Sequence, residues 1–157
     1  MFEEKDEKEE FLYFYKKAKG RERRIQENIR ELRERQASAS GMQYTAMPHG
    51  TEISDLSDYI VKVENKCKKL AETMYRTDKI YDIITTTLQR QLDKEEYLVL
   101  YYIYLKEYPI TRIADKLNMA RPTVYLTRRK ALDHLHIEYD TVAKIEKLLY
   151  EGDAEYQ

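Results

Sequence analysis

The chain has 157 residues, of which 42% are hydrophobic and 36% are charged. This length suits one domain or two small ones, and the composition is typical of long amphipathic helices that bury one apolar stripe. No apolar run approaches the roughly 20 residues of a membrane span, and a single cysteine, Cys67, excludes an intrachain disulfide. Since the acidic N-terminus lacks a signal-peptide pattern, we expect a cytoplasmic protein that has no membrane partner.

The net charge of −1 hides strongly charged blocks. Residues 109–132 carry six basic residues and one acid, whereas residues 133–157 carry two basic residues and seven acids. Residues 16–35 are basic as well, but their acids and bases alternate, which predicts a solvated helix face. Because the local field governs the approach of nucleic acid, residues 109–132 form the candidate nucleic-acid contact.

The first expected element is a helix over residues 9–36. Residues four and three apart form a heptad seam, in which a glutamate fills one position. Residues 1–10 hold six acids and two lysines, so we expect them to be disordered or frayed. The seam consists of Phe11, Tyr15, Ala18, Glu22, Ile25, Ile29 and Leu32.

A loop is predicted over residues 37–53, where small residues, two glycines and one proline follow no sustained period. A second helix is predicted over residues 55–91, with Ser54 or Asp55 as its N-cap. Its heptad seam runs without a miss through Leu56, Ile60, Val63, Cys67, Leu70, Met74, Thr77, Tyr81, Ile84 and Leu88.

A seam this narrow needs a partner helix. The simplest partner is the first helix, folded back antiparallel, which predicts a coiled-coil-like helical hairpin over residues 11–91. We expect Cys67 to be a small buried hydrophobe on this seam. Seam residues near Leu70–Leu88 are expected to be left over, and to pack on the C-terminal domain or on a second protomer.

Residues 93–107 are predicted to form a third helix. Asp93 followed by Glu96 matches a capping box. The tyrosine-rich run that follows contains almost no basic residue, so its aromatic rings are expected to lie in the core. A platform for stacked bases would need aromatic rings on an exposed basic surface.

Two short helices joined by a three-residue turn are predicted from Pro109 to Leu135. Asn118 tolerates the left-handed backbone that such a turn requires, and Pro122 fits the first turn of the second helix. This pattern is typical of a helix-turn-helix and predicts a DNA-binding domain over residues 92–137. An acidic amphipathic helix or tail is expected over residues 138–157. The inward positions are Ile110, Ile113, Ala114, Leu117, Val124, Ala131 and Leu135, with Thr127 or Arg128 between Val124 and Ala131 and with Met119 at the corner.

The second of these helices is the candidate recognition helix. Arginine can contact guanine O6 and N7 with two hydrogen bonds, and apolar side chains can contact a thymine methyl group. The base-reading candidates are Arg121, Pro122, Thr123, Tyr125, Leu126 and Arg129. Basic and hydroxyl side chains at the flanks position the protein on phosphates, and the candidates for this role are Thr111, Arg112, Arg128 and Lys130.

The string NMARPTVYLTRRKALDHL resembles the recognition half of a sigma-70 region 4 helix-turn-helix. The likeness rests on the turn, on Arg121 at the helix start, on Val124 in the core and on Ala131–Leu132 near the end. The chain departs from that family at Asn118, where glycine is usual, and at Ala120, where serine is usual.

A narrower resemblance covers residues 11–135. Two long helices, an MPHG loop at residues 47–50 and the sigma-like C-terminus resemble phage-encoded transcriptional regulators of the RinA/ArpU type. That resemblance implies control of phage late genes in a bacterial host cell, and the resemblance to sigma factors implies contact with the host RNA polymerase. The helix-turn-helix predicts double-stranded DNA as the partner. A lone helix-turn-helix buries little DNA surface, so a homodimer formed through the long helices is expected.

No catalytic residue, metal site or cofactor site is expected. His134 and His136 are two residues apart and point to different sides of a helix. No cysteine or carboxylate cluster completes a metal site, and neither a phosphate-binding loop nor a hydrolase signature is present. Two alternatives remain open: the DNA-recognition small subunit of a phage packaging terminase, and a helical adaptor that does not bind DNA.

Overall fold

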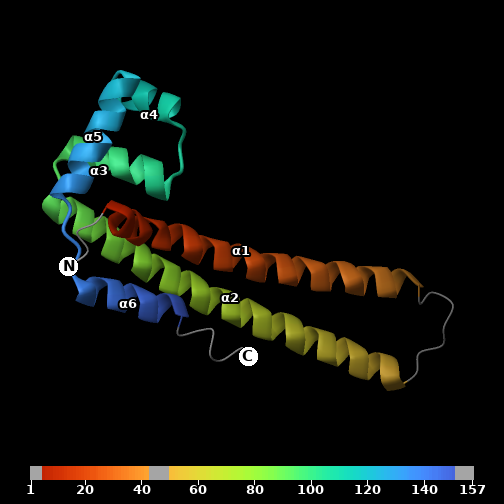
Figure 1. Cartoon of the computed structure of the whole chain (residues 1–157). Helices are drawn as coiled ribbons and strands as arrows, with labels where there is room; N and C mark the ends of the chain where they lie inside the picture. Colours follow the sequence, from red (N-terminus) through yellow and green to blue (C-terminus); the bar gives the residue numbers. More distant parts are fainter. Residues whose placement is uncertain (1–4, 43–49, 151–157) are drawn as a thin grey trace. The chain divides into compact units, whose positions relative to one another are not determined.

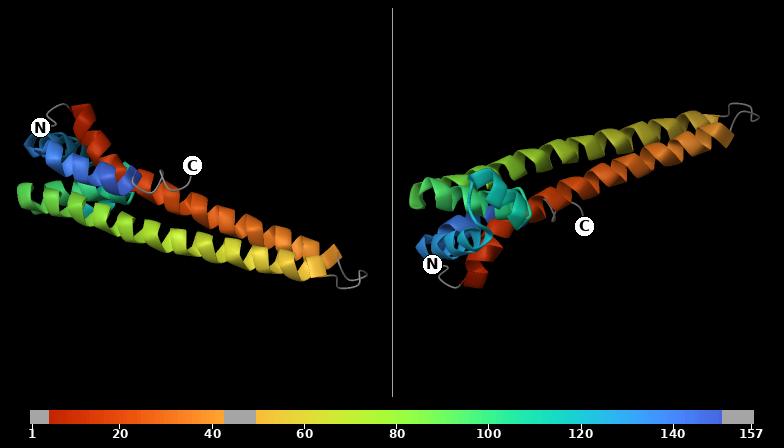
Figure 2. Two further views of the ribbon diagram at one scale, coloured as in Figure 1. Left: turned by 90° about the horizontal axis from the view of Figure 1, so that it is seen from below. Right: turned by 90° about the horizontal axis from the view of Figure 1, so that it is seen from above.

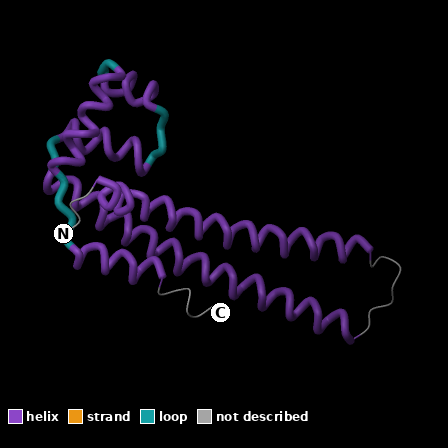
Figure 3. Tube along the Cα trace, viewed as in Figure 1, coloured by secondary structure: helices purple, strands orange, loops and turns teal. Residues whose placement is uncertain are grey.

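The computed structural model describes residues 5–42 and 50–150. The regular elements in this part of the chain are helical, so the predicted all-α class is confirmed (Figure 3). No helix among these residues is both long enough and apolar enough to cross a bilayer. In chain order (Figure 1) the elements are α1 (Lys5–Met42), α2 (Gly50–Gln91), α3 (Lys94–Leu100), the π-helix η1 (Tyr101–Leu105), α4 (Ile110–Leu117), α5 (Arg121–His134) and α6 (Tyr139–Tyr150).

Both long helices extend into the segment that was predicted to be a loop. α1 continues to Met42 and α2 begins at Gly50, so the predicted caps Ser54 and Asp55 lie inside α2. Alanine and serine are tolerated in helices, and the only proline of the segment is Pro48. Nothing in the sequence therefore stops α1 near residue 37. Most of the MPHG loop lies outside the described residues.

The chain forms two compact units. One consists of residues 1–18 and 76–157, and the other of residues 19–75. The predicted domain boundary, between residues 91 and 92, differs from this division. The first turns of α1 and the last turns of α2 belong with the C-terminal helices, because they share one hydrophobic core with them.

The unit of residues 19–75 is an antiparallel pair formed by the later part of α1 and the earlier part of α2 (Figure 2). On α1 the predicted seam is confirmed, since Glu22, Ile25 and Ile29 are buried. On α2 the prediction of a buried Cys67 is wrong, because this residue is exposed. Leu56, Ile60 and Met74 of the same stripe are exposed as well.

The other unit has a continuous core to which α1, α2, α3, η1, α5 and α6 all contribute. α6 also packs its apolar face into this core. Of the α2 seam residues that were expected to be left over, Ile84 and Leu88 are buried there, whereas Met74 is exposed in the other unit. The buried residues are Phe11, Leu12, Phe14 and Ala18 of α1, Ile80, Ile84, Leu88 and Leu92 at the end of α2, Leu100, Tyr104 and Leu105 of α3 and η1, Ala131, Leu132, Leu135 and Ile137 in and after α5, and Val142, Ile145 and Leu149 of α6.

The prediction of a frayed N-terminus is wrong for residues 5–10. These residues are helical, and Lys8 is buried with its Nζ atom donating to the Leu132 carbonyl oxygen at 2.7 Å. Glu9 is half-buried and forms an ion pair with Arg128. The charges that argued against packing are therefore partnered by a segment more than a hundred residues away.

The predicted third helix is confirmed, including its cap. The Asp93 side chain accepts a hydrogen bond from the Glu96 backbone at 2.8 Å, and the Glu96 side chain accepts one from the Asp93 backbone. Glu96 Oε2 also lies 2.6 Å from His134 Nδ1, which connects the start of α3 to the end of α5. This contact holds the end of α5 against α3.

Candidate nucleic-acid interface

The connection between α4 and α5 has the geometry of a tight turn. α4 ends at Leu117, and Asn118 follows with φ 53° and ψ 46°, the left-handed conformation that was predicted for it. The Asn118 and Met119 N–H groups both donate to the Ala114 carbonyl oxygen, and Met119 does so at 3.0 Å. These bonds satisfy the end of α4 and redirect the chain into α5 after two more residues.

A small core lies beneath this turn and holds the two helices together. Its buried members are Val99, Ile113, Ala114 and Val124. The predicted inward positions of both helices are thereby confirmed, and Met119 packs at the corner as expected. The partly buried residues around this core are Tyr102, Ile103, Tyr108, Ile110, Leu117 and Met119.

α5 begins without a side-chain cap. Ala120 occupies the N-cap position in an extended conformation, and its carbonyl oxygen accepts from the N–H groups of Thr123 and Val124 at 2.9 and 3.1 Å. Pro122 lies in the first turn, as predicted, and no acidic residue is present there. The positive end of the α5 dipole is therefore not neutralised by a carboxylate of its own first turn.

The outer face of α5 carries all six base-reading candidates, and each of them is exposed. Tyr125 and Leu126 are each 48% exposed, which is high for side chains of their size. Among the described residues, no hydrogen bond or ion pair engages Arg121, Arg129 or Lys130. The helix thus presents three uncompensated cations beside two apolar side chains.

α4 contributes the predicted phosphate contacts Thr111 and Arg112, which are both exposed, and Arg112 adds a cation. The Arg112 guanidinium lies 3.8 Å from the centre of the Tyr108 ring. Lys116, one turn further along α4, lies 5.7 Å from the same ring. Sequence analysis missed Lys116 and Tyr108. The signal for Lys116 was its spacing of four residues from Arg112, which places the two basic side chains on one helix face.

Arg128 does not belong to the outer face. Its guanidinium donates to Glu9 Oε1 at 2.9 Å and, through Nε, to the Tyr104 hydroxyl at 3.2 Å. It lies four residues after Val124 and three before Ala131, so it continues the inward row of α5. The phosphate contact expected from Arg128 is therefore not supported, because an intramolecular carboxylate already neutralises its charge.

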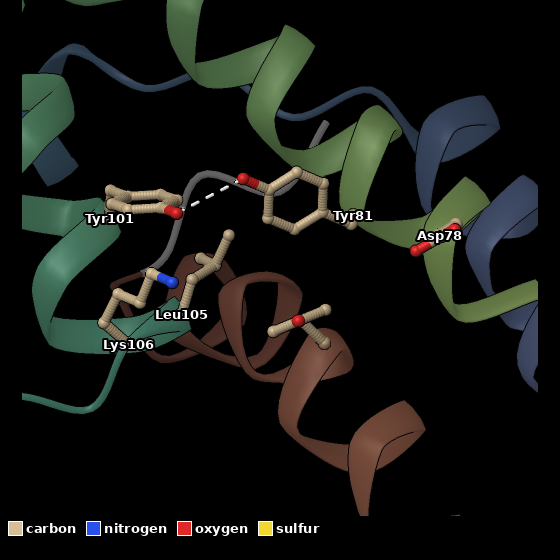
Figure 4. A pocket seen from close by; sticks show the side chains of 6 residues that line it. Asp78, Tyr81, Tyr101, Leu105 and Lys106 are labelled. Atoms are coloured by element: carbon tan, nitrogen blue, oxygen red, sulfur yellow. Dashed lines mark hydrogen bonds between the residues drawn. The ribbon is translucent and has the colours of Figure 1, made fainter. Parts of the chain in front are cut away.

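A hollow of about 220 Å³ lies between α1, the later part of α2 and η1 (Figure 4). The Tyr81 and Tyr101 hydroxyl oxygens are 3.3 Å apart there, and this hydrogen bond raises the pKa of Tyr81. The centres of the Tyr15 and Tyr81 rings are 5.4 Å apart, which is direct contact, so no cation fits between them. The lining residues are Tyr15, Asp78, Tyr81, Tyr101, Leu105 and Lys106.

No family model, curated protein sequence or solved structure matches this chain. Within the described residues, no group of three or more His, Cys, Asp and Glu side chains could hold a metal ion. The exposed faces of α4 and α5 are therefore the candidate functional surface.

The phenol of Tyr104, which contacts Arg128, gives the C-terminal unit a pH dependence. Burial raises the pKa of Tyr104 to about 12, although the hydrogen bond from Arg128 partly opposes this. Because the unfolded value is near 10, the stabilising contribution is complete below pH 10 and is lost as the pH rises toward 12. We expect the free energy of unfolding to fall by about 2 kcal/mol more over this range in the native chain than in Tyr104→Phe.

Urea titrations at several pH values measure this difference. The other tyrosines titrate in both proteins and cancel in the comparison. Equal slopes for the two proteins would contradict the assignment to Tyr104.

Proposed function

We propose that this chain is a sequence-specific regulator of transcription that binds double-stranded DNA in the cytoplasm and has no enzymatic activity. The observation that carries the proposal is the outer face of α5. Arg121, Arg129 and Lys130 are exposed there and have no side-chain partner among the described residues, beside exposed Tyr125 and Leu126. An adaptor that used α5 only for packing would have no need of such a face.

Each side chain has a chemically defined role in this proposal. Arg121 and Arg129 donate to guanine O6 and N7, and Thr123 bonds a base edge or a phosphate. Tyr125 and Leu126 contact thymine methyl groups, with Pro122 beside them at the start of the helix. Lys130 on α5 binds phosphates and sets the register.

The polar residues of α4 support the same orientation of the protein on DNA. Thr111, Arg112 and Lys116 lie on the helix that precedes the recognition helix, where a helix-turn-helix crosses the DNA backbone. The stacking of Arg112 on Tyr108 holds its guanidinium in place before any phosphate is bound. The entropy lost on binding is thereby reduced.

The finer parts of the proposal rest on the resemblance to sigma-70 region 4 and to the RinA/ArpU type of regulator. They are activation of phage late genes and contact with the host RNA polymerase. A homodimer would present two copies of α5 to two half-sites, as helix-turn-helix dimers do. A ring of many protomers would instead favour the packaging-terminase alternative.

The test is a binding titration of the purified protein with DNA from upstream of its own and neighbouring operons. It is run at two salt concentrations, with random DNA as competitor. We expect specific binding that weakens with salt. Arg121→Ala and Arg129→Ala should each cost about 1–3 kcal/mol on the specific site, or roughly 5- to 150-fold in affinity.

Two controls separate base reading from general charge effects. Lys130→Ala should weaken binding to all sequences alike and reduce the salt slope by about one. Lys144→Ala removes an exposed lysine of α6 and should leave affinity unchanged. If specific binding is absent at both salt concentrations, or if the two arginine variants bind like the native chain, the regulator proposal fails and the adaptor alternative replaces it.

A further inference from the structure

The unit of residues 19–75 leaves an apolar stripe of α2 uncovered. Leu56 is 47% exposed, Ile60 46% and Met74 47%, and Cys67 is exposed in the same heptad row. Val63 and Leu70 complete the row and are half-buried. The α1 side chains that are buried in the described part of this unit, Glu22, Ile25 and Ile29, leave the other four residues of this row exposed.

The spacing of the stripe is symmetric about Asn65. Leu56 and Met74 lie nine residues before and after it, Ile60 and Leu70 lie five, and Val63 and Cys67 lie two. An antiparallel copy of α2 would therefore place each member of one half opposite a member of the other half. In this arrangement a residue of the first copy contacts a second position in the partner, and the same two positions also meet with the copies reversed. Such reciprocal contacts define a two-fold symmetric interface.

Charges beside the stripe agree with this arrangement. Glu64 and Lys68 are exposed and border it. Around a two-fold axis at Asn65, Glu64 of one chain lies within about two residues of the level of Lys68 of the other, so the two carboxylates stand between two ammonium groups. Ser57 and Ala71, on the same border, are small and meet at the ends, where they permit close approach of the helices.

We propose that α2 is the self-association surface of this protein, and that two copies pair antiparallel through Leu56, Ile60, Val63, Cys67, Leu70 and Met74. The two hairpins then form a four-helix bundle, in which the α2 helices of the two chains contact each other. This names the surface of the homodimer in the proposed function. It is independent of DNA, since no residue of α4 or α5 takes part.

The first test measures the mass of the full chain by analytical ultracentrifugation without DNA. We expect a dimer whose dissociation constant rises about tenfold or more in Ile60→Lys. Val61→Lys is the matched control, because Val61 is the neighbouring residue, is 53% exposed and lies outside the stripe. It should change the dissociation constant by less than about twofold. Circular dichroism checks that both variants keep the helical content of the native chain.

The second test fixes the direction of pairing through disulfide formation under mild oxidation. The antiparallel register places position 63 opposite Cys67 of the second copy, so Val63→Cys should form a covalent dimer. A parallel pair would place the two native Cys67 thiols opposite each other instead. The Val63→Cys, Cys67→Ser double variant serves as the control and should stay unlinked.

The outcomes are distinct from those of the DNA experiment. A native chain that remains monomeric at all concentrations, or a Val61→Lys variant as weakened as Ile60→Lys, overturns the proposed surface. Efficient cross-linking of the native chain or of the Val63→Cys, Cys67→Ser double variant, each of which has a cysteine at only one of the two positions, overturns the antiparallel register. Neither result bears on whether a monomer binds DNA through α5.

Discussion

Phe11→Ala is expected to lower the free energy of unfolding by about 3–5 kcal/mol, the range found when a buried phenylalanine is truncated. Phe11 has no exposed surface and belongs to the core that joins α1 to α2, α5 and α6. Removal of its ring leaves a cavity among elements that cannot all collapse into it. Because the helix-turn-helix shares this core, specific DNA binding should be lost at the same urea concentration as helical content.

Urea denaturation followed by circular dichroism measures the loss of stability. Leu126→Ala is the matched control, since it truncates an apolar side chain on the exposed face of α5 and should change stability by no more than about 0.5 kcal/mol. If Phe11→Ala costs no more than the control, α1 does not pack against the C-terminal helices. The core described for this unit would then be wrong.

Lys8→Ala is expected to cost about 2–3 kcal/mol. The Lys8 ammonium is buried and donates to the Leu132 carbonyl oxygen at 2.7 Å, near the C-terminal end of α5. Hydrogen bonds to a charged group contribute about 1.5–3 kcal/mol, and a cation is also favourable at the negative end of a helix dipole. The aliphatic part of the side chain adds further packing.

The adjacent Glu9–Arg128 ion pair holds the middle of α5, so α1 contacts the candidate recognition helix at two points. Lys5→Ala is the control, because Lys5 is exposed one turn earlier on the same helix and should be nearly neutral. Thermal unfolding of both variants gives the comparison. A Lys8→Ala variant as stable as Lys5→Ala would show that α1 does not support α5 in solution.

Sequence analysis located most of the candidate interface because local rules dominate there. The left-handed turn at Asn118, the proline in the first turn of α5 and the buried row through Val124 and Ala131 each follow from the chemistry of nearby residues. The six exposed positions of α5 follow from the same helical period. Arg128 is the exception: spacing alone left it between the inner and outer faces, and its partner Glu9 lies 119 residues away.

At the ends of the long helices, predictions from neighbouring residues were wrong. Six acids and two lysines in the first ten residues predicted disorder, because charged side chains seldom pay for their desolvation without a partner. Lys8 and Glu9 have such partners, and only the folded chain brings them together. The segment after residue 36 lacked an apolar period, yet α1 continues through it to Met42.

The sequence by itself determined the all-helical class, the capping box at Asp93, the turn at Asn118 and the exposed cationic face of α5. Each depends on residues within a few positions of one another, where backbone geometry leaves few choices. Only the tertiary structure decided which half of the α2 seam is covered. The heptad seam is continuous from Leu56 to Leu88, but Ile84 and Leu88 are buried in the core of their own unit, whereas Ile60 and Cys67 are exposed in the other. A heptad pattern specifies an apolar stripe that other helices must cover. The number of helices that cover it depends on the fold of the rest of the chain.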